Sequence, residues 1–325
     1  MILPKFDYQA PESVPAVCSL LTQAGDRAAI IAGGTDLLVQ MKQKTQVPEV
    51  VVGLKRINEL KSLSYCKDKG LKIGPMVTIQ NLATSAVVRD HFPVLAEAAS
   101  SVGAVQHQSM GTVGGNLCLD TRCWHYNQPA DWRQIHPACH KLGGNTCHTV
   151  KGAHKCYAVY SADVGTVLFA LDARVIITNS HGEKVISLEE FFIGDGVKPT
   201  NLQIGELVTG IIVPPRKSKF ARYYKLRPRR AMDFAQLGVV LVAFAEKKEY
   251  RVVFNAVAEK PLRFKNLEAM LSEGEISESL VADFTSKVVS RIKPVGNVSG
   301  SPAYRRKMAG ILLRMAFAEM GNSHE

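Results

Sequence analysis

The fold is decided first by residues 30–37, which read Ile30-Ile31-Ala32-Gly33-Gly34-Thr35-Asp36-Leu37. The apolar run at residues 28–32 predicts a short buried strand, and the spacing of residues 37–44 predicts a helix. Two glycines between them permit positive φ angles and let a ligand come close to the backbone. The helix start adds its dipole, and Thr35 adds a hydroxyl donor. The segment therefore favours an anion such as phosphate; a strand–turn–helix corner without a ligand is the competing interpretation.

A second glycine-rich segment follows further along the chain, reading Gly111-Thr112-Val113-Gly114-Gly115-Asn116. Its glycines again predict a backbone that passes close to another group. Neither segment is a Rossmann G-x-G-x-x-G or a Walker loop with its lysine. Two such loops in one domain are what a pyrophosphate held from both sides requires. Together they favour nucleotide binding over two unrelated turns.

The length and composition set the class of protein. A chain of 325 residues predicts two or three domains. No apolar run reaches the roughly 20 residues that span a bilayer, and residues 1–7 lack the pattern of a secretory signal. These features predict a cytoplasmic protein, in which seven cysteines serve as thiols or metal ligands rather than disulfides.

The formal net charge of +11 raises the question of an anionic partner. The basic residues are scattered, and the sequence has no helix-turn-helix, RNP-type aromatic motif or zinc-finger spacing. The charge therefore favours an anionic cofactor and acidic protein partners over nucleic acid. The densest basic run, residues 225–230, could be a solvated edge or could bring cations towards a flavin.

The segment from Leu119 to Tyr160 lacks regular periodicity and reads as an inserted, metal-organised loop. It contains four cysteines, spaced C-x15-C-x7-C-x8-C: Cys123, Cys139, Cys147 and Cys156. Structural zinc sites usually show a close C-x2–4-C pair, and this segment has none. The spacing favours a [4Fe-4S] cluster, with zinc or metal-free thiols as alternatives. Cys18, Cys66 and Cys118 are interpreted as packing residues.

The remaining pattern predicts an α+β protein with a boundary near residues 214–218. Strands are expected at residues 28–32, 50–52, 71–74, 174–178, 206–213, 220–226, 238–245 and 251–257. Helices are expected at residues 13–21, 37–44, 94–100, 164–171, 263–271, 277–292 and 304–320, and in a helix that Thr78 caps.

Several segments occur in an order shared with one known family. They are Ala32-Gly33-Gly34-Thr35-Asp36-Leu37, Gly74-Pro75-Met76-Val77-Thr78, Gly111-Thr112-Val113-Gly114-Gly115-Asn116 and Arg229-Arg230-Ala231-Met232-Asp233-Phe234-Ala235. Together they resemble the flavoprotein (medium) subunits of the xanthine oxidase family of molybdenum hydroxylases. Each segment is weak alone, but the combination is highly specific and covers essentially the whole chain.

The resemblance implies a fold and a cofactor. Residues 1–216 would form an FAD-binding domain of the PCMH, or vanillyl-alcohol-oxidase, type, with the iron–sulfur loop inserted at residues 119–160. Residues 217–325 would form an α+β domain like the C-terminal domain of the carbon monoxide dehydrogenase flavoprotein. The two glycine segments would embrace the FAD diphosphate.

The resemblance also implies the residues that contact FAD. Asp163, displaced along the chain by the insert, matches an Asp that contacts the FAD ribose region, and Lys225 would lie near the flavin. The implied set is Ile30, Ile31, Ala32, Gly33, Gly34, Thr35, Asp36, Leu37, Thr78, Val102, Gly111, Thr112, Val113, Gly114, Gly115, Asn116, Asp163 and Lys225.

Most members of this family have a much shorter stretch where the insert lies. A reductive member carries an additional [4Fe-4S] cluster in an insert of this kind. That likeness implies electron flow from reduced ferredoxin through the cluster and FAD to a small [2Fe-2S] subunit and a large molybdenum-cofactor subunit, in a dimer of heterotrimers. The chain itself would carry no catalytic residue and would serve anaerobic aromatic degradation.

Three alternatives compete with this interpretation. The chain could be the flavoprotein subunit of an oxidative hydroxylase with structural zinc in the insert, a basic nucleic-acid-binding protein, or a stand-alone flavin oxidase. Cationic residues of the insert suggest a docking surface for an acidic ferredoxin. They are Arg122, Arg133, Lys141, Lys151 and Lys155, against Asp120 and Asp131.

Overall fold

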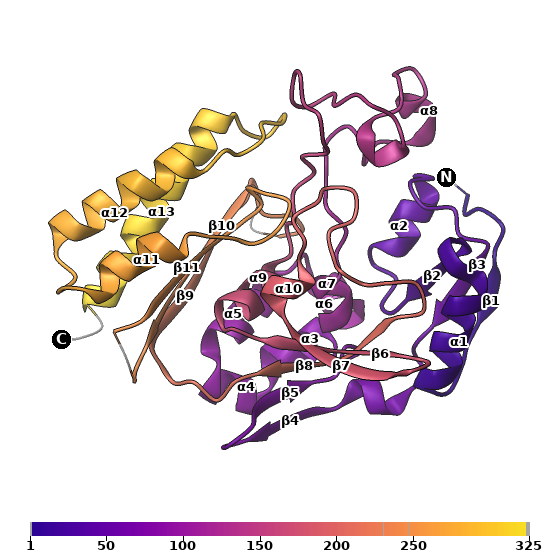
Figure 1. The fold of residues 1–325 in the computed structure, drawn as a ribbon, viewed down its shortest axis with the longest axis horizontal. Helices are drawn as coiled ribbons and strands as arrows, with labels where there is room; N and C mark the ends of the chain where they lie inside the picture. Colours follow the sequence, from indigo (N-terminus) through magenta and orange to yellow (C-terminus); the bar gives the residue numbers. More distant parts are fainter. Residues whose placement is uncertain (1, 230, 247, 323–325) are drawn as a thin grey trace.

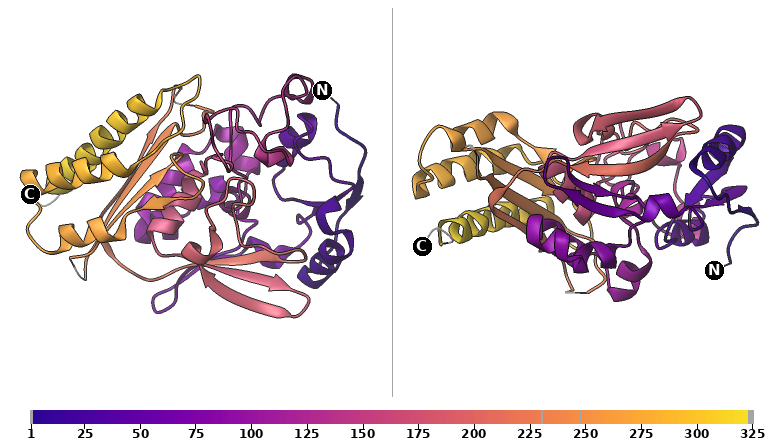
Figure 2. Two further views of the ribbon diagram at one scale, coloured as in Figure 1. Left: turned by 45° about the horizontal axis from the view of Figure 1, so that its top comes forward. Right: turned by 90° about the horizontal axis from the view of Figure 1, so that it is seen from below.

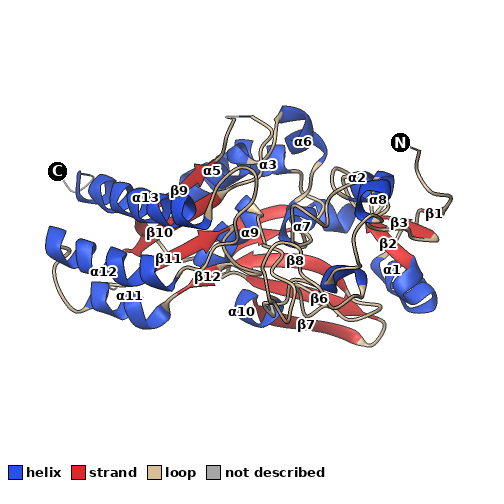
Figure 3. Cartoon of the chain, turned by 90° about the horizontal axis from the view of Figure 1, so that it is seen from above, coloured by secondary structure: helices blue, strands red, loops and turns tan. Residues whose placement is uncertain are grey.

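The computed structural model describes residues 2–229, 231–246 and 248–322, which form three sheets and a layer of helices at one end. In Figure 1 the chain runs from the N-terminal sheet at the right, through a central five-stranded sheet, to three C-terminal helices at the left. Figure 3, seen from above, shows the same order of layers. Arg230, part of the basic run, lies outside the described residues.

The N-terminal sheet is parallel, in the order β1 (Asp7–Gln9), β3 (Val50–Gly53), β2 (Ala28–Ile31). Helix α1 (Val14–Ala24) buries Val17, Cys18 and Leu21 against it. Ser13 caps α1 by accepting from the N–H of Ala16, an interaction worth about 1 kcal/mol. Helix α2 (Leu37–Lys42) follows β2 through the first glycine segment, as the sequence predicts.

The central sheet is antiparallel and has the order β4 (Leu63–Cys66), β5 (Gly70–Ile73), β8 (Leu207–Val213), β6 (Arg174–Asn179), β7 (Gly182–Ser187). Its apolar face joins the main core with α3 (Ile79–Thr84), α5 (Pro93–Ser101) and α9 (Asp163–Ala170). The shorter helices are α4 (Ala86–His91), α6 (Val105–Met110), α7 (Val113–Leu117), α8 (Ala130–Arg133) and α10 (Leu188–Phe191).

The C-terminal sheet is also antiparallel, in the order β12 (Leu262–Arg263), β11 (Tyr250–Asn255), β10 (Leu237–Phe244), β9 (Ser218–Leu226). Strand β10 is buried on both faces. Its Val240 and Val242 pack into the main core, whereas Val239 and Leu241 pack into a second core. That second core is closed by α11 (Lys265–Ser272), α12 (Glu278–Arg291) and α13 (Pro302–Asn322). The sheet is therefore a wall shared by two hydrophobic cores.

The segment from Leu119 to Tyr160 has little regular structure, as the sequence predicts. Its α-helix is the single turn α8, which lies next to α2 in Figures 1 and 3. In the left view of Figure 2, part of the segment lies beside the N-terminus. In the described part of the chain, no helix combines the length and apolar character of a membrane span.

The sequence-based elements are confirmed with small shifts at their ends, but two interpretations are wrong. Cys66 lies exposed on β4 rather than packed. The segment 113–116 is the start of helix α7 rather than an open loop, because Thr112 caps it by accepting from the N–H of Gly115. Strand β7, of six residues, pairs antiparallel with β6 and was not expected from its polar sequence.

Candidate functional site: a large cleft beside a four-cysteine cavity

A large cavity has a volume of about 920 Å³, which is within the range of pockets that hold organic cofactors. The two glycine segments form part of its wall, and residues from all three sheets or their connections complete it. The loop between β9 and β10 contributes Met232, Asp233 and Phe234. The cavity is therefore built by both halves of the chain.

The first glycine segment presents unpaired backbone donors to this cavity. Among the described residues, no acceptor receives a hydrogen bond from the N–H groups of Gly33, Gly34 or Thr35. Gly34 has φ +73°, which favours glycine. A Cβ on Gly33 would lie 1.8 Å from the carbonyl oxygen of Met110. Gly33 therefore lets the two segments pack directly against each other, while the free N–H groups suit a phosphate.

Most backbone N–H groups of the second glycine segment donate hydrogen bonds to acceptors within the protein. The N–H of Val113 donates to Val77, and that of Gly114 donates to Pro75. A Cβ on Gly114 would come within 2.5 Å of the Pro75 side chain. The side-chain oxygen of Asn116 accepts from the N–H groups of Val164 and Gly165, at 3.1 and 3.2 Å. Asn116 therefore caps the first turn of α9 and fixes the cavity wall where the chain re-enters after the insert.

Asp163 and Lys225 form a buried ion pair at the inner wall of the cavity, with Nζ–Oδ2 2.7 Å. The hydroxyl of Tyr223 donates to the other carboxylate oxygen, and Lys225 also donates to the carbonyl of Ser101. Burial raises the pKa of Asp163, and the charge and hydrogen bonds of Lys225 and Tyr223 oppose that rise. The pair joins α9 of the first half to β9 of the second.

Most residues of the implied FAD set line this one cavity. They are Ile30, Ala32, Gly33, Gly34, Thr35, Asp36, Leu37, Val102, Gly111, Thr112, Gly114, Gly115, Asn116, Asp163 and Lys225. Three members of the set are placed elsewhere. Val113 lies in the main core, Ile31 lies on β2 outside the cavity lining, and Thr78 caps α3 by accepting from the N–H of Asn81.

Arg122 lines the large cavity, but the sequence did not identify it as part of the cofactor site. Its guanidinium donates to the carboxylate of Asp36 at 3.1 Å and lies 4.0 Å from the centroid of the Phe234 ring. Burial raises the pKa of Asp36, and Arg122 opposes the rise. Arg122 lines the large cavity and also a second, smaller one. Its position immediately before Cys123 is the signal that could have identified it.

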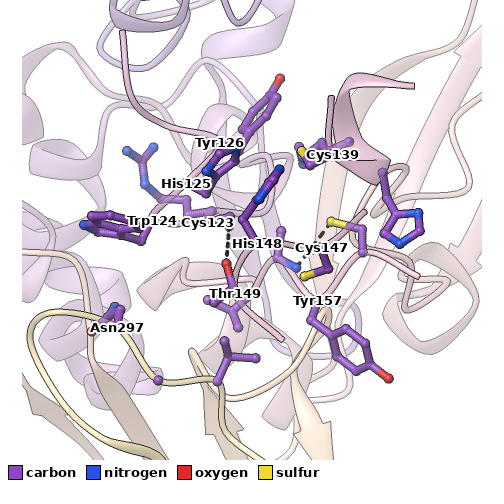
Figure 4. Close-up of a pocket in the computed structure, with 18 of the residues that line it drawn as sticks. Cys123, Trp124, His125, Tyr126, Cys139, Cys147, His148, Thr149, Tyr157 and Asn297 are labelled. Atoms are coloured by element: carbon purple, nitrogen blue, oxygen red, sulfur yellow. Dashed lines mark hydrogen bonds between the residues drawn. The ribbon is translucent and has the colours of Figure 1, made fainter. Parts of the chain in front are cut away.

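The smaller cavity, of about 50 Å³, is lined by all four cysteines of the insert: Cys123, Cys139, Cys147 and Cys156. All four are free thiols. Cys123 Sγ contacts the Thr149 hydroxyl at 3.3 Å (Figure 4). Cys147 Sγ accepts from the N–H of Val150 at 3.3 Å, and Cys156 Sγ accepts from that of Ala158 at 3.4 Å. Hydrogen bonds to sulfur are a feature that tunes iron–sulfur clusters.

The thiols share a cavity without forming a finished coordination sphere. Across the described residues, no three His, Cys, Asp or Glu side chains stand close enough to hold a metal ion. Burial raises the pKa of Cys156 to about 11, and the nearby Cys123 and Cys139 add to that rise. Cys156 is thus a protonated thiol here, and metal binding would require loss of its proton and convergence of the four sulfurs.

Aromatic and imidazole rings surround the cysteines. The rings of His125 and His148 stack with centroids 4.1 Å apart, and Trp132 packs edge-on to His125. Figure 4 shows His125 and His148 side by side among the labelled cysteines. Burial, with His148 and His136, lowers the pKa of His125 to about 4. The cavity is therefore bordered by stacked rings, of which His125 has a lowered pKa.

Buried cationic side chains of the insert bind it to the rest of the chain. Lys141, 4% exposed, donates to Asp120 at 2.7 Å, to Thr121, and to the carbonyl of Gly196 at 2.9 Å. Arg133 donates to the carbonyls of Tyr126, Gln128 and Lys44. At the neck, Arg122 and Val159 exchange two backbone hydrogen bonds of 2.8 and 2.9 Å.

These contacts correct the suggestion that the cationic residues of the insert form a docking surface for an acidic ferredoxin. Arg133 and Lys141 are buried, Arg122 is bound to Asp36, and Lys155 pairs with Glu259 at 2.8 Å. Of the five cations, only Lys151 is exposed with no polar partner in the described part of the chain. The basic bias of the insert therefore serves mainly its own structure.

The large cavity, with free backbone N–H groups and a buried ion pair in its wall, suits an anionic organic cofactor, and the comparisons agree with this description. Residues 4–216 match the model of the FAD binding domain in molybdopterin dehydrogenase, and residues 222–320 match that of the CO dehydrogenase flavoprotein C-terminal domain. The chain belongs to this family: it is an FAD-binding subunit of the xanthine oxidase-family molybdenum hydroxylases, of the CO dehydrogenase medium-chain type.

Several relatives match along most of their length. The glyceraldehyde dehydrogenase medium chain of Sulfolobus acidocaldarius is 28% identical, covering 98% of this chain and 100% of its own. The aldehyde oxidoreductase FAD-binding subunit PaoB of Escherichia coli is 31% identical, over 83% of this chain and 86% of its own. A carbon monoxide dehydrogenase structure from Hydrogenophaga pseudoflava shares the fold, with a TM-score of 0.81, 24% identity and 99% coverage of both chains.

Proposed function

We propose that this chain is the electron-transfer flavoprotein subunit of a molybdenum enzyme complex, with FAD in the large cavity and a [4Fe-4S] centre on the four cysteines of the insert. When bound, the two groups supply one-electron and two-electron redox chemistry. The chain's residues hold them and exclude water. The large molybdenum-cofactor subunit and the small [2Fe-2S] subunit would be its partners.

The observation that carries this proposal is the wall shared by the two cavities. Arg122 lines both, its side chain binds Asp36 of the first glycine segment, and the next residue is Cys123. The residues that would hold a metal and those that would hold the cofactor are therefore connected through Arg122 and the adjacent Cys123. Four free thiols line one cavity, and two of their sulfurs accept backbone hydrogen bonds; both observations support the metal.

The oxidative alternative has support of its own. The relatives reported above are named as dehydrogenases or as an aldehyde oxidoreductase, and these names favour a complex that oxidises its substrate. In that case the insert would hold structural zinc. For the overall reaction, this alternative agrees better with the comparisons. It differs from the iron–sulfur proposal in the metal that the insert would hold, zinc instead of iron.

The finer proposal is the β subunit of 4-hydroxybenzoyl-CoA reductase. In that complex, electrons from reduced ferredoxin would remove the phenolic hydroxyl of 4-hydroxybenzoyl-CoA and give benzoyl-CoA. It rests on the four-cysteine insert alone, and none of the relatives reported above carries that name. The docking surface for a ferredoxin would have to use groups other than the buried cations of the insert.

Metal analysis of the anaerobically purified complex tests the proposal. We expect about four iron atoms and four acid-labile sulfides per FAD beyond those of the [2Fe-2S] subunit. Replacement of Cys147 by serine should remove them and abolish the corresponding EPR signal of the reduced protein. The matched control is Cys66→Ser, because Cys66 is an exposed thiol far along the chain from the insert.

The alternatives give different results. Zinc in place of iron, lost in Cys147→Ser, would establish the oxidative alternative's structural site. Substrate-dependent reduction of the flavin by an aldehyde or a heteroaromatic compound would favour the oxidative complex. Ferredoxin-dependent turnover of 4-hydroxybenzoyl-CoA would be required for the reductase.

A further inference from the structure

Two buried polar nitrogens without hydrogen-bond partners belong to residues that line the four-cysteine cavity. They are Nε2 of His125, from the insert, and Nε of Arg305, from helix α13. Each side chain belongs to a residue that is only 3% exposed. Leaving a buried polar group unpaired costs about 1–3 kcal/mol, so two such nitrogens at one cavity require an explanation.

Arg305 is the more costly of the two. One of its terminal nitrogens donates to the carbonyl of Gln236 at 3.0 Å. No carboxylate among the described residues forms an ion pair with it. A buried guanidinium without a counter-charge is strongly unfavourable. Burial accordingly lowers the pKa of Arg305.

The cavity itself can supply the missing charge. Four thiolates give either a zinc ion or an iron–sulfur cube a net negative charge, and sulfur accepts hydrogen bonds. The cations already described do not meet this need, because Lys141 and Arg133 are committed to oxygen acceptors. His125 can donate in the tautomer protonated at Nε2.

We infer that Arg305 and His125 are positioning residues for an anionic metal centre on the four cysteines, donating to it from two different domains and raising its reduction potential. This inference rests on the proposed [4Fe-4S] centre. It also means that α13 of the C-terminal domain completes a site whose ligands all belong to the insert. A donor stabilises the reduced, more negative cluster more than the oxidised one, so its removal makes reduction harder.

The test is a redox titration of the reduced cluster by EPR in the whole complex. Arg305→Met keeps the length of the stem but removes the charge and the donors, and His125→Phe keeps a ring but removes the N–H. For each we expect the ratio of reduced to oxidised cluster at a fixed poised potential to fall about tenfold, which is about 59 mV for one electron. The conservative variants Arg305→Lys and His125→Gln should recover part of this ratio.

The control is Lys287→Met on α12, whose ammonium is exposed and pairs with Asp283. It should leave the ratio unchanged. Iron content and flavin content are measured for every variant, and loss of iron from Arg305→Met with retention in Arg305→Lys would also support the inference. Full iron content with an unchanged ratio in both Arg305→Met and His125→Phe would overturn it, and would mean that water in the cavity accepts these hydrogen bonds. A wild-type protein without iron would overturn the proposed cluster itself.

Discussion

The two cavities are built in opposite ways. The large one is made by the ends of strands and helices, and its glycine segments are held by backbone contacts between Gly33 and Met110 and between Gly114 and Pro75. The four-cysteine cavity is made by an irregular segment that depends on buried cations, chiefly Lys141 and Arg133. The first is rigid because close-packed backbone leaves no space, whereas the second depends on a few polar contacts that can be removed one at a time.

This difference predicts which changes affect which cofactor. Steric changes should act mainly on the large cavity, and charge changes mainly on the insert. A metal would also stabilise the insert, because a site formed by distant ligands contributes its binding energy to folding.

The largest effect is expected for Gly33→Ala. Its Cβ would lie 1.8 Å from the Met110 carbonyl oxygen, so the two glycine segments must separate. We expect a cost of ~3 kcal/mol, at the upper end for an overpacked site, and on the order of hundredfold weaker FAD binding. Flavin absorbance per protein after gel filtration measures it. Gly274→Ala is the control, because nothing lies within 4 Å of its added Cβ; equal flavin content in both variants would contradict the packing role.

A smaller and more local effect is expected for Lys141→Met. Removing one partner of this ion pair leaves Asp120 and the Thr121 carbonyl without their donor, at a cost of about 3 kcal/mol confined to the insert. Hydrogen exchange over residues 119–160 should increase while flavin content stays near that of the wild type. Lys151→Met, at an exposed position, should change neither. Loss of flavin together with the insert would show that the two regions do not respond separately.

The smallest effect is expected for Glu206→Gln on the wall of the large cavity. Burial opposes ionisation of Glu206, but hydrogen bonds from Lys184 and the N–H of Gln203 outweigh it and hold its pKa below the usual value. Because the pKa is lower in the folded state, this stabilisation is present above the unfolded pKa and is lost as the pH falls through the folded one. Glu206→Gln should therefore lower the free energy of unfolding by about 1 kcal/mol at pH 7 and by less at pH 4.

Urea denaturation at the two pH values measures this difference. Glu183→Gln, on exposed β7, serves as the control and should show no such pH dependence. A constant difference between Glu206→Gln and the wild type at both pH values would exclude the depressed pKa as its cause.

The elements around each cavity were largely predictable, because local patterns specify them. The apolar run before Gly33, the spacing after Leu37 and the caps Ser13 and Thr78 all act within a few residues. The individual roles were harder to predict. Asn116 caps a helix that begins 47 residues later, and Gly33 packs on a residue 77 positions away. Such contacts exist only after the chain has folded.

The roles of the charged side chains in the insert were equally hard to predict from the sequence. Its lack of periodicity correctly predicted an irregular segment, but Lys141 and Arg133 read as surface cations because most lysines and arginines are exposed. Their acceptors are largely backbone carbonyls, such as those of Gly196 and Lys44, which carry no sequence signal. Arg305, on a helix more than 140 residues after the last cysteine of the insert, could not be connected with that segment from sequence at all.

The double burial of strand β10 has a consequence for dissecting the protein. Because Val240 and Val242 face one core and Val239 and Leu241 the other, a cut near residue 216 would strip both fragments of a packing surface. Neither the flavin-binding half nor the helical half would then be a faithful substitute for the whole chain, and fragments that separate them should aggregate. Domain-swap chimaeras between relatives would succeed only if they exchange this strand together with both sets of residues it contacts.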